Sequence, residues 1–362
     1  MVQVHLEALR MADIISVRFF HTMRDTILIA PDKFNGTLTA FEVAEIIAEA
    51  LSAFTSLRLL RVPMSDGGEG TPHQLNGAPV IVSSDFIGPQ CYPGIGVLDR
   101  SSFPLGMGIR EMLETQKPFY VGIGGTATVE GGAGALQALG VLFFDESNRI
   151  VTEPITPRHL LSISRIDTNN VNGILDGRCT LLCDVKASLL GPGLSSLDFA
   201  EQKGASPEDK NIIIKALKNF QKLLPHIPLS PFAGAGGGLP FSLTGIAGAD
   251  SVSGAQYILA TKNIDWDRIA LVITGEGSLD FQTSGGKVVE TVCREVVKRK
   301  IPTLIVAGYE DGQFKKLNPS INVISCIQDK KDFLTEKAYC RLQECLRNNL
   351  PDIISKIVSK EF

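Results

Sequence analysis

The chain has 362 residues, of which 44% are hydrophobic and 20% charged, and its formal net charge is −4. This length predicts two domains of a globular enzyme, whereas the charge balance excludes a polybasic nucleic-acid surface and no apolar run is long enough to span a bilayer. Seven cysteines, an odd number, are typical of the reduced thiols of a cytoplasmic protein.

Residues 1–23 precede the first predicted strand and differ from the rest of the chain. They mix arginines with acidic residues, and they lack the apolar core and small-residue cleavage site of a secretory signal. We interpret them as an N-terminal extension outside the fold.

The first predicted strand, residues 26–31, is apolar and β-branched, which is typical of a buried parallel strand. Asp32 follows its last residue directly. Apolar residues then recur at helical spacing over 39–51, and this periodicity predicts a helix.

A second strand is predicted over 57–63. It runs into the sequence S-D-G-G-E-G-T, which carries Asp66 and Glu69. The glycines indicate a loop, so both carboxylates are expected just beyond the end of this strand.

Residues 119–134 form a first glycine-rich block, with a predicted strand entering it and a predicted helix, 133–139, leaving it. Backbone amides at such a helix start can bind an anion. Residues 122–127 also fit G-x-G-x-x-A, and the next predicted strand, 141–144, ends in Asp145, as in a dinucleotide-binding fingerprint. This block leaves a nicotinamide-dependent oxidoreductase open.

Another short apolar strand is predicted over 180–183 and ends in Asp184. A second glycine cluster, 232–240, lacks the Lys-Ser/Thr pair of a P-loop, so it is not a Walker motif. A tight loop that allows close packing is the alternative to a ligand-binding role for this cluster.

The last of these strands, 270–274, is again apolar and β-branched, and we expect it to stop at Gly275. Glu276, Asp280 and Lys287 follow within a short stretch. Carboxylates bind hard divalent cations and lysine neutralises phosphoryl oxygens, so this segment indicates phosphate and metal chemistry.

Four predicted strands therefore each deliver an acid just past their last residue: Asp32, Asp66, Asp184 and Glu276. In open α/β sheets, ligands bind beyond the carboxyl ends of the strands. We expect these acids to converge on one rim.

Taken together, these blocks resemble the bacterial type of glycerate kinase. The first family motif, roughly D-S-F-K-G-S-L, corresponds to D-K-F-N-G-T-L at 32–38. Its A-D-G-G-E-G-T corresponds to 65–71, and its G-I-G-G-S-A-T-N-D-G-G-A-G to 122–134. The shorter motifs C-D-V, Q-K-G-A, G-A-G-A-A-G-G-L and T-G-E-G…D…Q-T…G-K are matched, in the same order, at 183–185, 202–205, 233–239 and 274–287.

This resemblance implies an α/β fold of two α/β domains with a central cleft, one of them Rossmann-like with a mostly parallel sheet. It implies ATP and Mg²⁺ as cosubstrates and phosphoryl transfer to a hydroxyl of D-glycerate, giving 2-phosphoglycerate. We expect residues 24–80 and 256–362 to form a discontinuous Rossmann-like domain and 81–255 to form the second domain. The oligomeric state stays open, a homo-oligomer included.

The residue pattern and the resemblance together assign the candidate site residues to four groups. The predicted catalytic residues are Asp184, Lys287 and Asp32, with Asp184 orienting or deprotonating the attacking hydroxyl. The predicted substrate-binding residues are Asp66, Glu69 and Asn35. The predicted nucleotide-binding residues are Gly124, Gly125, Thr126, Gly236 and Gly237. The predicted Mg²⁺ ligands are Glu276 and Asp280.

The chain departs from the family pattern at several positions. Asn35 replaces the motif lysine, Val129-Glu130 replaces Asn-Asp, and the segment between about 87 and 101 is shorter than in the family. Because losing a cation at a phosphate site weakens anion binding, a catalytically impaired relative that still binds ligands is a second interpretation.

Overall fold

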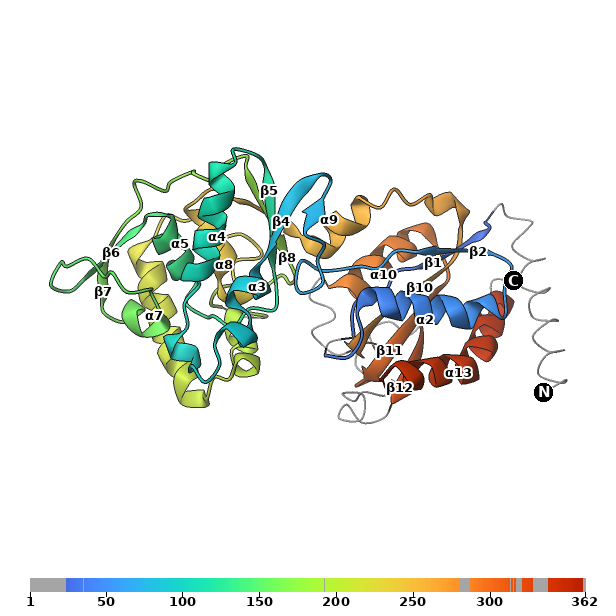
Figure 1. Ribbon diagram of the computed structural model, residues 1–362. Helices are drawn as coiled ribbons and strands as arrows, with labels where there is room; N and C mark the ends of the chain where they lie inside the picture. Colours follow the sequence, from blue (N-terminus) through green and yellow to red (C-terminus); the bar gives the residue numbers. More distant parts are fainter. Residues whose placement is uncertain are drawn as a thin grey trace. The chain divides into compact units, whose positions relative to one another are not determined.

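The computed structural model describes residues 24–34, 36–191, 193–279, 287–312, 314, 316, 321–327 and 338–360 (Figure 1). The chain divides into two compact units, one of Met1–Ser65 with Ile258–Phe362 and one of Asp66–Tyr257. Residues 66–80 belong to the second unit because the strands that they carry pair within its sheet. The domain boundaries suggested by the sequence, near residues 80 and 256, stay a prediction.

The first unit is built on a five-stranded sheet in the order β12-β11-β10-β1-β2, in which every neighbouring pair is parallel. Its strands are β1 (Thr26–Ile29), β2 (Arg58–Arg61), β10 (Ile269–Leu279), β11 (Thr303–Glu310) and β12 (Asn322–Ile327). Its helices are α2 (Ala40–Ser52), α10 (Val288–Arg299) and α13 (Ala338–Lys360), and α9 (Gly254–Ala260) contains the boundary between the units.

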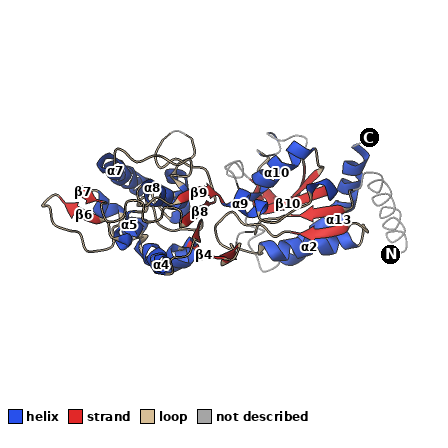
Figure 2. Cartoon of the chain, turned by 90° about the horizontal axis from the view of Figure 1, so that it is seen from above, coloured by secondary structure: helices blue, strands red, loops and turns tan. Residues whose placement is uncertain are grey.

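Different helices cover the two faces of this sheet, as Figure 2 shows for α2 and α10. Along β11, Leu304 and Val306 belong to a core shared with α2 and α13, whereas Ile305 and Ala307 pack with Val289 of α10. Successive side chains of a strand point to opposite faces, and both faces here are apolar. This explains why β1 and the first half of β10 are nearly continuous apolar runs.

Helix α2 confirms the helix predicted over 39–51, and its start is fixed by a reciprocal cap. The Thr39 hydroxyl accepts a hydrogen bond from the Glu42 amide at 3.2 Å, and the Glu42 carboxylate accepts one from the Thr39 amide at 2.8 Å. This capping box satisfies two backbone donors that the first helical turn would otherwise leave without partners.

The second unit contains a five-stranded sheet in the order β3-β4-β5-β8-β9, parallel except for the β3–β4 pair. Its strands are β3 (Gln74–Leu75), β4 (Ala78–Val82), β5 (Phe119–Ile123), β8 (Cys179–Cys183) and β9 (Asp250–Ser253). Strands β6 (Leu142–Asp145) and β7 (Ile163–Asp167) form a separate antiparallel pair. The predicted α/β fold with mostly parallel sheets is thus confirmed.

The helices of the second unit are α3 (Ser83–Ile87), α4 (Phe103–Glu114), α5 (Ala133–Leu139), α6 (Pro157–Leu160), α7 (Pro207–Leu223) and α8 (Leu239–Gly245). Phe220 of α7 joins β6 to α8, because its ring centroid lies 6.3 Å from that of Phe143 and 5.5 Å from that of Phe241. None of the helices in the described part of the chain combines the length and apolarity needed to cross a membrane.

Candidate active site

In the first unit, Asp32 lies beside the strand that carries Glu276. Strands β1 and β10 are parallel neighbours, and the pairing continues past β1 because the Asp32 amide donates to the Gly275 carbonyl at 2.8 Å. The Thr274 hydroxyl also donates to the Ala30 carbonyl at 2.8 Å. Both acids are buried, each with 6% of its surface exposed, so two neighbouring chain segments of the sheet each carry a buried carboxyl group.

The prediction that the strand stops at Gly275 is wrong. Strand β10 continues to Leu279 and pairs with β11 along this stretch, with Gly275 opposite Val306 and Glu276 opposite Ala307. A β-carbon at Gly275 would overlap the Val306 carbonyl oxygen. The glycine therefore permits close approach of the neighbouring strand, and Glu276 lies inside the sheet.

Of the other predicted site residues of the first unit, the structure describes only Lys287. Lys287 is half-buried and immediately precedes α10. Asp280 and Asn35 lie outside the described residues, so their assigned roles stay predictions. Within the described ranges, no group of three or more His, Cys, Asp and Glu side chains could hold a metal ion.

In the second unit, the loop that carries Asp66 crosses directly over the sheet. Gly67 has a φ of +104°, and a β-carbon there would overlap the Leu182 carbonyl oxygen of β8. A β-carbon at Gly122 of β5 would in turn overlap the carbonyl oxygen of Gly67. Only glycine fits these positions. Asp66 is buried, and its Oδ1 accepts a hydrogen bond from the Gly68 amide at 3.0 Å.

This crossing brings Asp184 to the Gly124 turn. A β-carbon at Gly124 would lie 2.7 Å from the Gly68 Cα and 3.3 Å from Asp184 Oδ2. Asp184 follows β8, and its amide donates to the Ile123 carbonyl at 3.2 Å. The structure therefore brings together the Asp66 loop, the Gly124 turn and Asp184, whereas Glu69 on the same loop is exposed.

Ser83 is a positioning residue that the sequence analysis did not identify. Its buried hydroxyl donates to the Gly124 carbonyl at 3.2 Å and accepts from the Gly124 amide at 3.3 Å, although 41 positions separate the two residues. It follows the end of β4, next to β5 in the sheet. The sequence pattern predicted no strand directly before Ser83, and a single serine gives no local signal of such a contact.

The second glycine cluster packs onto the first. A β-carbon at Gly236 would lie 2.6 Å from Ile123 Cγ2, and one at Gly237 would overlap the Thr128 carbonyl oxygen. Protein atoms thus fill the space that side chains would need, which agrees with the tight-loop interpretation. Nucleotide binding by Gly236 and Gly237 stays a prediction.

Lys203 reaches into the space between the two glycine clusters. Its Nζ donates to Thr126 Oγ1 at 3.0 Å and to the Thr128 carbonyl at 2.8 Å. Burial lowers the pKa of Lys203 to about 8, and the carboxyl groups of Asp184 and Glu130 partly offset this shift because they favour the ammonium form. A lysine of perturbed pKa beside a strand-end acid is typical of functional sites.

The sequence model of the Glycerate kinase family matches residues 27–93 and 95–358 of this chain. The chain belongs to the glycerate kinase family. A glycerate kinase of Neisseria meningitidis serogroup B is 31% identical over 299 residues, which cover 72% of this chain and 80% of that protein. The glycerate 2-kinase of Escherichia coli is 30% identical over 325 residues, covering 78% and 84%. The crystal structure of a candidate glycerate kinase 2 from Salmonella typhimurium LT2 has a TM-score of 0.67 and 25% identity, covering 93% of this chain and 99% of that one.

Glu130 stands where the glycerate kinase family has aspartate, and it has a structural partner. It is buried, and its Oε1 accepts a hydrogen bond from the Ser102 amide at 2.7 Å. Burial raises the pKa of Glu130, which the bond to Ser102 counteracts. The longer side chain thus keeps a carboxyl group at this position and ties it to the start of α4.

The anion site expected at the start of α5 is filled by protein. The Ala135 amide donates to Ser102 Oγ at 2.9 Å, and a β-carbon at Gly134 would overlap Ser101 Oγ. Residues 101–103 therefore cover this helix start, which removes it as a phosphate site.

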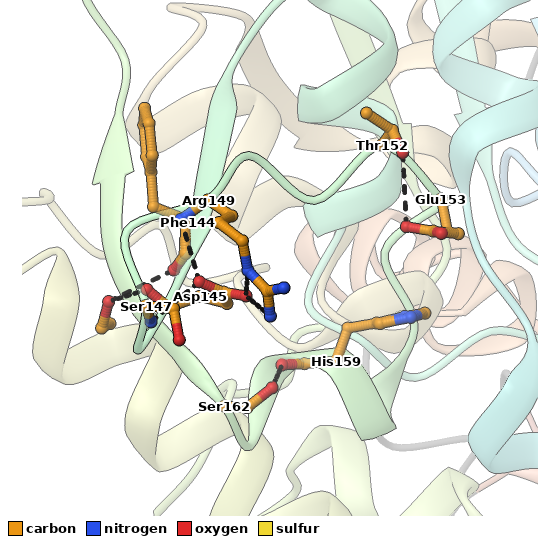
Figure 3. Close-up of polar contacts among 9 residues, drawn as sticks. Phe144, Asp145, Ser147, Arg149, Thr152, Glu153, His159 and Ser162 are labelled. Carbon is orange, nitrogen blue, oxygen red and sulfur yellow. Dashed lines mark hydrogen bonds and ion pairs between the residues drawn. The ribbon is translucent and has the colours of Figure 1, made fainter.

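The dinucleotide fingerprint around Gly122 is also wrong. It requires the strand after the helix to join the same parallel sheet, but β6 pairs only with β7, antiparallel, in the described structure. Asp145 is the last residue of β6, where its Oδ1 accepts from the Ser147 amide of the following turn and its Oδ2 pairs with Arg149 Nη2, both at 2.8 Å (Figure 3). The oxidoreductase interpretation therefore loses its only support.

Replacing Lys203 with methionine is expected to change how stability depends on pH. The unfolded chain keeps its lysines protonated to about pH 10.4, whereas the folded protein releases the Lys203 proton near pH 8. Between these values the unfolded state binds more protons, so the free energy of unfolding of the wild type rises with pH relative to Lys203→Met. Urea unfolding should show a relative gain of about 1–3 kcal/mol between pH 7 and pH 10.

The matched control is Lys215→Met, which removes an exposed lysine of α7. Its stability difference from the wild type should not vary with pH in this range. An equally flat difference for Lys203→Met would show that folding does not lower the pKa of Lys203.

Proposed function

We propose that this member of the family is a glycerate kinase that uses ATP and Mg²⁺ to phosphorylate a hydroxyl of D-glycerate, giving 2-phosphoglycerate. The γ-phosphoryl group leaves ADP, a bond forms between phosphorus and the glycerate oxygen, and the hydroxyl proton is released to a base. Phosphoryl transfer needs little covalent chemistry from the protein, so positioning and charge neutralisation supply most of the catalysis.

The observation that carries this proposal is the arrangement around Asp184. Its carboxyl group lies beside the Gly124 turn, and Lys203 is the nearby cation that its charge stabilises. In the proposed reaction Asp184 orients the attacking hydroxyl and accepts its proton. Asp66 and Glu69, on the glycine loop that crosses the sheet, are proposed to bind the substrate, together with Asn35.

The side chains present fit the cosubstrates. Mg²⁺ prefers oxygen ligands and is held in kinases by one or two carboxylates together with substrate phosphates. Glu276, buried beside Asp32, is proposed to hold Mg²⁺ with Asp280, and Lys287 to neutralise the phosphates. Bound Mg–ATP would supply the transferable phosphoryl group, and the Gly124–Thr126 turn is proposed to bind the nucleotide.

A coupled assay of ADP release with D-glycerate, ATP and Mg²⁺ tests this function directly. Turnover that needs all three components is the expected result. Tight binding of Mg–ATP without turnover would instead establish an impaired relative, the interpretation that Asn35 and Val129 suggest. A different hydroxy acid as the better acceptor would correct the substrate and leave the reaction class in place.

Mg–ATP is expected to stabilise the purified protein against thermal unfolding, whereas NAD is expected to have little effect. A ligand that binds only the folded state adds about 2.7 kcal/mol at a hundredfold excess over its Kd. The midpoint temperature should be measured with ATP alone, Mg–ATP and NAD at equal concentrations. A shift with NAD that exceeds the shift with Mg–ATP would contradict the kinase assignment.

A further inference from the structure

The hydrogen bonds of Lys203 leave part of its ammonium group unused. An ammonium group has three N–H donors and no acceptor. Two of them bind Thr126 Oγ1 at 3.0 Å and the Thr128 carbonyl at 2.8 Å. Among the residues that the structure describes, no third acceptor lies at hydrogen-bond distance from Nζ. A β-carbon at Gly237 would lie only 3.0 Å from Nζ, so the absence of a side chain there makes room for the cation.

The first of these bonds fixes the direction of the Thr126 hydroxyl. Protonated lysine can only donate, so Thr126 Oγ1 must act as acceptor and its own proton must point elsewhere. In the described part of the chain this hydroxyl donates to no protein acceptor, although Thr126 is buried with 6% exposure. The proton is thus available to a ligand at the Gly124–Thr126 turn.

Three charged side chains near Lys203 influence the pH at which it loses its proton. Asp184 after β8 and Glu130 before α5 favour its ammonium form, whereas Arg100 disfavours it. Arg100 is held nearby, because its Nη1 donates to the Lys203 carbonyl at 2.9 Å and to the Ala127 carbonyl at 3.2 Å. These are the charged groups that face Lys203 from the elements packed around it.

We propose that Lys203 is a positioning residue of the kinase reaction: its ammonium group turns the Thr126 hydroxyl toward a nucleotide phosphate oxygen and places a positive charge near Asp184. This inference rests on the proposed function and extends it to a residue outside the predicted site. When Lys203 loses its proton, its lone pair can accept from Thr126, and the hydroxyl then turns away from the phosphate.

The pH dependence of ATP use tests this device. Because Lys203 titrates near pH 8, the wild-type kcat/KM for ATP should fall above about pH 8. Lys203→Arg, which stays charged, should keep its kcat/KM constant to about pH 10. Lys203→Met should lose about tenfold or more in kcat/KM at pH 7 and lack this basic limb, as expected for a lost charge-assisted bond.

A double-mutant cycle separates positioning from a general loss of structure. Thr126→Val should lower kcat/KM for ATP, and combining it with Lys203→Met should add little, because both remove the same interaction. Lys215→Met, at an exposed position of α7, should match the wild type. Thermal unfolding checks that each variant folds. If Lys203→Arg does not fold, the activity and pH profile of Lys203→Met alone test the proposal. Wild-type KM values and a wild-type pH profile in Lys203→Met would overturn the proposal.

Failure of the proposed function is distinguishable from failure of this inference. If the wild type releases no ADP with D-glycerate, the function is wrong, and calorimetry of Mg–ATP binding then tests Lys203 alone. The wild-type affinity should fall above about pH 8, and the Lys203→Arg affinity should not. Equal pH dependence in both proteins would overturn the inference whatever the acceptor substrate is.

Discussion

Asp184→Asn is expected to lower kcat by about a hundredfold or more while the protein stays folded, which is the scale of a lost general base. Asparagine keeps the size of the side chain and can still contact the hydroxyl, but it cannot take its proton. The bond from the Asp184 amide to the Ile123 carbonyl involves only backbone atoms, so the substitution leaves it intact. Turnover should be measured in the coupled assay at saturating D-glycerate and Mg–ATP.

Asp250→Asn is the matched control for this experiment. Asp250 is an exposed acid at the start of β9. It pairs with Thr180 near the start of β8, whereas Asp184 follows the end of β8. The Asp250→Asn variant should retain wild-type kcat. The Mg–ATP thermal shift of Asp184→Asn should also persist, because the change removes the proposed base and none of the proposed nucleotide contacts. A kcat within a few-fold of the wild type would remove Asp184 from the catalytic role.

Gly67→Ala is expected to cost about 2–5 kcal/mol of unfolding free energy, which combines left-handed backbone strain with overpacking. Its φ is +104°, and the new β-carbon would overlap the Leu182 carbonyl oxygen, which backbone on both sides prevents from moving. The loop that carries Asp66 must lift off the sheet to relieve the overlap. Activity should therefore fall together with stability, as measured by urea unfolding and the coupled assay.

Gly70→Ala separates the two contributions. Gly70 lies in the same loop with a φ of +85°, but no atom lies within 4 Å of the position of its β-carbon. Alanine there should cost only about 1–2 kcal/mol, the strain term alone. Equal losses for the two variants would show that the close approach between Gly67 and β8 contributes nothing.

The elements that the sequence predicted well are those set by local patterns. The apolar runs ending at Asp32 and Asp184 are the strands β1 and β8, and the helical periodicity after Thr39 is α2. Each depends on neighbours within one turn or one strand, where periodicity and capping are decisive. The same patterns placed Asp66 and Asp184 in loops that the fold does bring together.

The predictions that failed depended on partners distant in sequence. Gly275 reads equally as a strand end or as a close-contact position, and only its pairing with Val306 decides between them. The fingerprint around Gly122 required β6 to join the sheet of β5, but β5 pairs with β4 and β8 instead. Lys203 was matched as part of the Q-K-G-A motif but given no site role, because Thr126, its partner, lies 77 positions away. No local spacing encodes such a contact.

The glycine contacts also decide how this protein can be engineered. At Gly67, Gly122 and Gly124 backbone packs directly against backbone, so the side chain of any other amino acid there would clash with main-chain atoms. A combinatorial library that randomises them would return mostly misfolded clones, whatever acceptor is used for selection. Libraries aimed at new acceptors should keep the glycines and vary positions such as Glu69, which is proposed to bind the substrate and is exposed, so that a new side chain there leaves the packing of the loop intact.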